Sequence, residues 1–180
     1  MSFYRNYGKQ LFDLILVIPG LLFLLPLFII ITIIIKINLG TPVLFNQPRP
    51  GKDEKIFTAL KFRTMTEERD SSGNLLPDSK SITKIGGLLR KTSMDELPQL
   101  INVLTGKMSL VGPRPLLIEY LDYYSPREKK RHQIRPGITC IAQVSGRNIL
   151  DWYKRLEYDV RQSPTLLQAA MVRLEALWNF

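Results

Sequence analysis

Hydrophobic and polar residues are unevenly distributed along the chain. Residues 14–35, LILVIPGLLFLLPLFIIITIII, contain no charged side chain. A helix of this length is sufficient to cross the hydrocarbon core of a bilayer. The run is too long for a removable signal peptide, and no small-residue cleavage site follows it. The pattern therefore predicts a membrane helix.

Two features favour a helix that enters the membrane and returns to the same side. Pro26 lies near the middle of the run, where a proline removes a backbone hydrogen bond and bends a helix. Both flanks are basic, since Arg5 and Lys9 precede the run and six Lys or Arg residues follow it by position 63. The positive-inside rule places both flanks on the cytoplasmic side. We expect a re-entrant helix–break–helix in residues 1–38, with an ordinary kinked span as the alternative.

Residues 39–180 carry the patterns of both strands and helices, and we expect a small cytosolic globular domain there. Residues 43–45 and 55–65 are β-prone and lie among Gly-Thr-Pro and Arg-Pro-Gly turn signals. An apolar set at helical spacing indicates a helix with one buried face: Leu97, Leu100, Ile101 and Leu104. The fold class is therefore α+β, mostly helical.

The last part of the chain indicates another amphipathic helix. Ser163 and Pro164 form a good N-cap and first helical residue for a helix over residues 163–180. Its Trp, Phe and Arg residues suit a helix lying in the membrane interface, but a core helix has the same pattern. Both interpretations stay open.

The net charge of +9 points to anionic partners. A nucleic-acid binder would show a contiguous basic face or a known module, and the sequence shows neither. Basic charge beside an apolar segment instead fits an anionic phospholipid membrane. The single cysteine excludes an internal disulfide, and the single histidine excludes a histidine-rich metal site.

Asp95 and Glu96 form the most informative polar pair. Ser93 and Glu96 match a capping box, so the acids could simply begin a helix. Pro98 fits better if Asp95 is the N-cap, because proline is tolerated in a first helical turn. In that position the Asp95 carboxylate lies at the positive end of a helix, where phosphate also binds. It is then a candidate nucleophile toward phosphorus, and Glu96 would share the substrate through Mg²⁺.

Three arginines stand next to proline or glycine, which restrict or shape the local backbone: Arg114, Arg135 and Arg147. Rigidly held guanidinium groups suit the recognition of phosphate. Each arginine alone is best explained as a solvated surface charge. The three together favour a phosphate-binding site.

These residues lie in motifs that resemble the small monotopic phosphoglycosyl transferases of the bacterial sugar transferase family. The resemblance runs from FDLIL to about Val160. Its most specific parts are VLFNQPRPGKDEKIF, KFRTM, SMDELPQLINVLTGKMSLVGPRPLL, RPGIT and AQVSGRN. Within the family, the likeness is nearest to the enzyme that initiates N-glycan assembly in Campylobacter-type pathways.

The resemblance implies a two-step reaction at the cytoplasmic face of the bacterial inner membrane. Asp95 would attack a UDP-sugar and release UMP, and polyprenyl phosphate would then take the sugar phosphate from Asp95. Glu96 would assist Mg²⁺ binding together with Asp95. The remaining residues that the resemblance assigns to the donor site are Lys61, Arg90, Arg114, Arg135, Arg147 and Asp159. The sugar would be an N-acetylated hexose derivative.

The chain departs from the family pattern at three places. Leu25 replaces the serine that precedes the proline of the membrane helix break, Cys140-Ile141 replaces a Gly-Trp-type pair, and the likeness fades after EYDV. Other interpretations are a non-catalytic membrane-anchored interaction protein and a related enzyme with a spanning helix. Self-association into a homo-oligomer stays open.

Overall fold

The structure is a computed structural model that describes residues 8–70, 73–74, 76–77 and 81–140. The expected terminal helix over residues 163–180 lies outside the described residues. The same holds for Arg147 and Asp159, two of the expected site residues, and for Ile141 of the departing pair.

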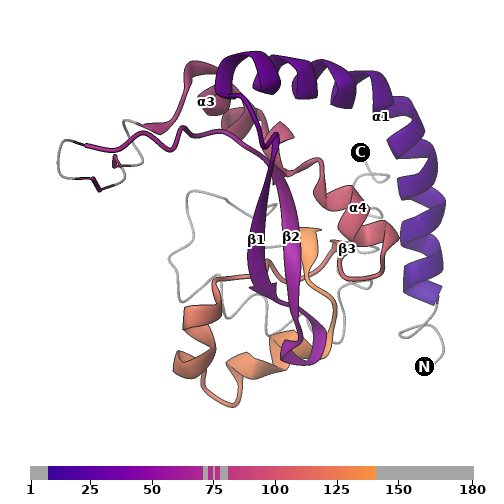
Figure 1. Cartoon of the computed structure of the whole chain (residues 1–180). Coiled ribbons are helices and arrows are strands. Elements are labelled where there is room, and N and C mark those ends of the chain that lie inside the picture. The colour runs from indigo at the N-terminus through magenta and orange to yellow at the C-terminus, as the bar shows by residue number, and fades with distance from the viewer. Residues whose placement is uncertain (1–7, 71–72, 75, 78–80, 141–180) are drawn as a thin grey trace, which may run out of the picture.

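The apolar run forms most of α1 (Lys9–Leu39), which among the described residues is long and apolar enough to cross a membrane. Figure 1 shows that α1 rises along one side of the domain and then bends to run across its top. Pro19 and Pro26 lie inside this helix, and each removes a backbone hydrogen bond that would otherwise stiffen it. The expected break is thus a bend within one continuous helix.

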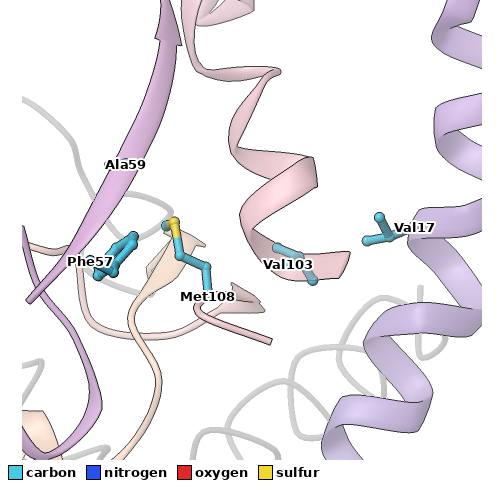
Figure 2. Packing of buried hydrophobic residues seen from close by; sticks show 5 residues of the cluster. All are labelled: Val17, Phe57, Ala59, Val103 and Met108. Atoms are coloured by element: carbon cyan, nitrogen blue, oxygen red, sulfur yellow. The ribbon is translucent and has the colours of Figure 1, made fainter. Parts of the chain in front are cut away.

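The first arm of α1 packs into a hydrophobic core beneath it. Figure 2 shows Val17 of α1 pointing toward Val103 of α4 (Gln99–Leu104). Phe57 and Ala59 of β2 (Ile56–Phe62) lie on the far side of α4 from α1. The buried members of this cluster are Val17, Phe57, Ala59, Val103 and Met108. One face of the start of this helix therefore packs into the interior of the domain.

The second arm of α1 packs into a separate core cluster. Its buried members come from α1, from β2 and from α3 (Lys84–Thr92): Ile31, Ile35, Phe62 and Leu89. Other α1 side chains are exposed, with Phe23 85% and Ile37 78% accessible. Both arms thus contact the same domain, while much of the apolar surface of α1 faces outward.

Strand β1 (Leu44–Pro50) pairs with β2 in an antiparallel hairpin, with Leu44 opposite Phe62 and Pro50 opposite Ile56. The expected strand over residues 55–65 is confirmed. The expected strand over residues 43–45 is too short, because β1 continues through Pro48 to Pro50. Proline is tolerated there because a two-stranded sheet leaves each strand with a free edge. The 3₁₀ turn η2 (Lys52–Glu54) closes the hairpin.

A second small sheet joins segments far apart in sequence. Strand β3 (Ser109–Val111) lies parallel to β4 (Gly137–Thr139). The backbones approach so closely that a Cβ on Gly137 would lie 2.1 Å from the backbone nitrogen of Gly112. Only glycine fits there. The 3₁₀ segments η4 (Ile118–Tyr123) and η5 (Glu128–Gln133) connect the two strands.

Helix α4 buries Gln99, Asn102 and Val103, so the apolar face expected for residues 97–104 is confirmed only in part. Leu97 and Leu100 pack against the core clusters, as expected. Ile101 and Leu104 are 39% and 36% exposed, whereas Asn102 is buried. The Asn102 side chain accepts from the Leu60 backbone N–H at 3.0 Å and donates to the Thr58 carbonyl at 2.8 Å. It therefore satisfies two backbone groups at the free edge of β2, which explains why this helix buries a polar side chain.

Candidate active site

The two adjacent acids lie on a short turn between two helices. Ser93 takes a left-handed conformation that ends α3, and the 3₁₀ turn η3 (Met94–Glu96) follows. Pro98 then precedes α4. The expected capping box is wrong, since the Ser93 side chain makes no cap hydrogen bond. Asp95 lies within η3 rather than at an N-cap, because Pro98 delays the α-helix until Gln99.

Glu96 is the centre of an ion-pair cluster. Its Oε1 lies 2.9 Å from the Lys61 Nζ of β2 and 2.5 Å from the Arg114 Nη2. Burial alone would raise the pKa of Glu96, but the charges and hydrogen bonds of Arg114 and Lys61 lower it overall. Glu96 is therefore ionised at neutral pH. Because the single negative charge of Glu96 faces the two positive charges of Lys61 and Arg114, this group of three side chains carries a net positive charge that can attract an anionic ligand.

Asp95 is buried, with 8% of its surface accessible. Burial raises the pKa of Asp95 and the charge of Glu96 raises it further, while Lys61 and Arg90 oppose this rise. A carboxylate that water solvates poorly is a better nucleophile and gains from a cationic partner. Asp95 is thus the candidate nucleophile of the pair, and Glu96 is held by two cations.

Arg90 comes from the last turn of α3 and reaches the end of β2. Its Nε donates to Thr64 Oγ1 at 3.0 Å, and its Nη2 lies 2.9 Å from Met65 Sδ. Helix α3 is fixed against the same segment, because a Cβ on Gly86 would lie 2.0 Å from the Thr64 carbonyl oxygen. The structure therefore places Lys61, Arg90 and Arg114, three of the expected donor-site residues, near the two acids.

Arg135 contacts helix α1 rather than the two acids. Its Nη2 donates to Gln10 Oε1 of α1 at 2.8 Å. Nearby, Lys9 contacts Asp13 and the hydroxyl of Ser109, which in turn donates to Asp13 Oδ2 at 2.7 Å. In the structure, Arg135 belongs to this polar contact between α1 and the second sheet.

Two arginines near the site were missed by sequence reasoning. Arg49 of β1 donates to Gln47 Oε1 at 2.6 Å and lies 3.4 Å from the Pro115 carbonyl oxygen. Arg131 of η5 is fully buried and donates to the Arg114 carbonyl oxygen at 2.8 Å. Arg49 stands between two prolines, which is the signal that singled out Arg114. Nothing in the local sequence marks Arg131 as buried.

The described residues contain no cluster of three or more His, Cys, Asp or Glu side chains that could hold a metal ion. Asp95 and Glu96 supply hard carboxylate oxygens, the type that Mg²⁺ prefers. Oε1 of Glu96 is already shared by two cations, so its other oxygen is the freer ligand. The pair therefore fits Mg²⁺ only where a diphosphate supplies most of the coordination.

Comparisons with known proteins indicate the family of this chain. The family model for the bacterial sugar transferases matches residues 4–168. The chain is 54% identical to the sugar transferase EpsL of Bacillus subtilis over 153 residues, which are 84% of this chain and 75% of EpsL. It is 34% identical to the exopolysaccharide production protein ExoY of Sinorhizobium fredii over 169 residues, with 84% and 75% covered.

A third relative is longer than this chain. The UDP-glucose:undecaprenyl-phosphate glucose-1-phosphate transferase of Klebsiella pneumoniae is 39% identical over 162 residues, which are 84% of this chain but 35% of that protein. The narrower likeness to the Campylobacter-type initiating enzyme stays a prediction. The matched residues include both acids and the three cations around them, and the chain belongs to the bacterial sugar transferase family.

Proposed function

We propose that this transferase moves a sugar 1-phosphate from a UDP-sugar to a membrane polyprenyl phosphate such as undecaprenyl phosphate. The observation that carries the proposal is the buried Asp95 beside Glu96, whose carboxylate is held by Lys61 and Arg114. A relative that matches across 84% of this chain bears the name of a UDP-glucose:undecaprenyl-phosphate transferase. The product is a polyprenyl-diphosphate-sugar, the starting lipid of a bacterial glycoconjugate.

The reaction proceeds through Asp95 in two displacements. A carboxylate oxygen of Asp95 attacks the β-phosphorus of the UDP-sugar, the bond from that phosphorus to the bridging oxygen breaks, and UMP leaves. An oxygen of polyprenyl phosphate then attacks the phosphorus bound to Asp95 and frees the carboxylate. Burial of Asp95 favours the attack, because the carboxylate loses little solvation when it reacts.

Positive charge around Asp95 serves the phosphates of both substrates. Lys61 and Arg90 act electrostatically on Asp95, and Arg114 lies beside them on Glu96. Fixed cations stabilise charge that builds up as the phosphoryl group moves. Arg135, Arg147 and Asp159 stay expected contributors to the donor site.

Asp95 and the freer oxygen of Glu96 would hold Mg²⁺ together with the donor diphosphate. When bound, Mg²⁺ supplies neutralisation of the diphosphate charge. Glu96 keeps its own position through Lys61 and Arg114, so it orients the site whether or not the donor is present.

The proposed topology is re-entrant, with both ends of α1 on the cytoplasmic side. It is supported by the packing of both arms: Val17 lies in one core cluster, and Ile31 and Ile35 lie in the other. A straight spanning helix would carry one of these arms away from the domain. The outward apolar side chains would lie in one leaflet, with the acids close to the membrane surface.

UMP release tests the proposal. Purified protein is incubated with a UDP-sugar panel, which includes N-acetylated hexose derivatives, and with Mg²⁺ and undecaprenyl phosphate. Wild type should release UMP with one or a few donors, and Asp95→Asn should release none. Asp122→Asn, at an exposed acid, is the matched control and should act as wild type. Equal release by wild type and Asp95→Asn would remove Asp95 as nucleophile. No release with any donor would favour a non-catalytic, membrane-anchored role.

A further inference from the structure

We propose that Arg131 and Arg49 are positioning residues that hold the backbone of the Arg114–Pro115 segment, so that the Arg114 guanidinium stays on Glu96. The two arginines come from η5 and β1, two elements far apart in sequence. They donate to consecutive carbonyl oxygens, those of Arg114 and Pro115. The inference rests on the proposed function only for its catalytic consequence.

Arg131 makes the shorter of the two hydrogen bonds to this segment. Its Nη2 lies 2.8 Å from the Arg114 carbonyl oxygen, and its side chain is fully buried. The guanidinium carbon lies 5.7 Å from the centre of the Tyr124 ring, a distance at which a cation is attracted to an aromatic face. A buried arginine that is held on two sides offers its hydrogen bond in one fixed direction.

Arg49 supplies the second hydrogen bond to this segment, and it comes from β1, which precedes the segment in sequence. Its Nη1 lies 3.4 Å from the Pro115 carbonyl, and its Nη2 is held by Gln47 Oε1 at 2.6 Å. Within the described part of the chain, both hydrogen-bond partners of Arg49 are neutral oxygens and its guanidinium forms no salt bridge. Burial and the charge of Arg114 lower the pKa of Arg49, while Glu119 and Glu96 oppose this shift.

The two prolines beside Arg114 restrict the φ angles of this segment, but within the described residues few backbone hydrogen bonds fix its position. Arg114 lies between two prolines, which have no backbone N–H to donate. On the preceding side the Gly137 N–H donates to the Pro113 carbonyl at 3.0 Å. The Arg114 side chain is 36% exposed, so solvent competes for it. Two guanidinium donors on consecutive carbonyls restrict the backbone from which this side chain extends.

A double-mutant cycle tests whether the two residues act through Arg114. UDP is the probe, and its dissociation constant is measured for Arg49→Met and Arg131→Met in the wild-type and Arg114→Ala backgrounds. Each substitution should weaken UDP binding about tenfold in the wild-type background, the scale of one hydrogen bond to a charged group. In the Arg114→Ala background the change should be less than about twofold, because the positioned group is gone.

Matched variants separate positioning from general damage. Lys130→Met removes an exposed basic residue next to Arg131 and should bind UDP as wild type does. Arg49→Lys should recover most of the affinity lost in Arg49→Met, because an ammonium can also donate to one carbonyl. If Arg131→Met does not fold, the measurements on Arg49→Met and Arg49→Lys test the proposal. Equal losses in both backgrounds, or no loss in either, would overturn the proposal.

A second measurement does not depend on donor binding. Amide hydrogen exchange at Gly137 reports on the Pro113 carbonyl, next to the held segment. Arg49→Met and Arg131→Met should speed this exchange about tenfold, whereas Arg114→Ala, which keeps the backbone carbonyls, should not. Unchanged exchange in both variants would refute the positioning role. If wild type fails to bind UDP, the proposed donor is wrong, and exchange alone judges the inference.

Discussion

The Arg114 guanidinium contacts both carboxylate oxygens of Glu96, with Nη2 2.5 Å from Oε1 and Nη1 3.4 Å from Oε2. A lysine at position 114 has a single ammonium and cannot make this two-point contact. We expect Arg114→Lys to lower kcat/KM for UMP release by about 10- to 100-fold, the scale of a lost charge-assisted hydrogen bond. Arg69→Lys, at an exposed arginine, is the control. Wild-type kinetics for Arg114→Lys would show that the two-point contact has no catalytic role.

The raised pKa of Asp95 predicts a pH-dependent effect of Asp95→Asn on stability. Folding favours the protonated form of this carboxyl, because burial raises its pKa above the unfolded value. That stability is fully present below the unfolded pKa and is lost as the pH rises through the folded pKa. Asp95→Asn should therefore unfold at a higher temperature than wild type near pH 7.5. The difference should shrink toward about pH 4, where the unfolded carboxyl titrates. A difference that does not change with pH would contradict the assignment.

Two adjacent glycines of α3 should respond in opposite ways to alanine. A Cβ at position 86 would lie 2.0 Å from the Thr64 carbonyl oxygen, whereas at position 87 it meets only Ile82 Cγ2 at 3.8 Å. We expect Gly86→Ala to lower the free energy of unfolding by about 1–3 kcal/mol through overpacking. Gly87→Ala should be neutral or should stabilise by up to about 1 kcal/mol, since alanine favours helix. Denaturant unfolding in detergent measures both, and equal effects would contradict the close approach.

The Gly86 contact also predicts a loss of activity. The Thr64 side chain accepts from Arg90, so moving α3 away from Thr64 displaces this arginine from the acids. Gly86→Ala should therefore reduce UMP release even at temperatures where the variant stays folded. Gly87→Ala should keep full activity, and a parallel loss in both variants would point to general damage to α3.

Asp13 holds the first arm of α1 to the second sheet. It is 4% exposed, accepts from Ser109 and pairs with Lys9. Removing its charge leaves the Lys9 ammonium partly buried, and breaking such a pair costs about 3 kcal/mol. Asp13→Ala should therefore lower the unfolding temperature in detergent by about 6–12 °C for a chain of this size. Asp122→Ala, at an exposed acid, should change it little, and an equal small effect of both would argue against the contact.

The re-entrant topology predicts that both flanks of α1 are accessible from the cytoplasmic side. Thr41→Cys, in a Cys140→Ser background, supplies an exposed thiol just after the helix. A tag ahead of Met1 reports on the other flank. In inverted membrane vesicles both should react with an impermeant reagent or protease. In right-side-out vesicles neither should react. Opposite sidedness of the two flanks would establish a kinked span instead.

The sequence predicted elements that depend on local pattern. The uncharged run over residues 14–35 lies inside α1, and the β-prone run over residues 55–65 contains β2. These two predictions succeed because a long apolar run and a β-prone run leave few structural choices. Lys61, Arg90 and Arg114, which the resemblance assigns to the donor site, lie near the two acids, but their role in donor binding stays a prediction.

Predictions that depend on distant partners were less successful. The predicted buried face of α4 was correct only in part, because Asn102 is also buried and satisfies backbone groups of β2, which lie about 40 residues earlier in the chain. The second sheet was not predicted, since its strands are three residues long and pair across two 3₁₀ segments. Arg131 was not singled out from the sequence, yet it is fully buried and donates to the Arg114 carbonyl. No local pattern encodes such contacts.

The bent helix α1 has a practical consequence for handling this protein. Because Val17, Ile31 and Ile35 complete the two interior clusters, a truncated version that starts after Leu39 would uncover Phe62, Leu89 and Val103 at once. Apolar area of that extent drives aggregation. The long apolar helix is therefore also part of the interior of this domain, so we expect removal of residues 1–39 to give an aggregating fragment and purification to need the full helix in detergent or a lipid disc.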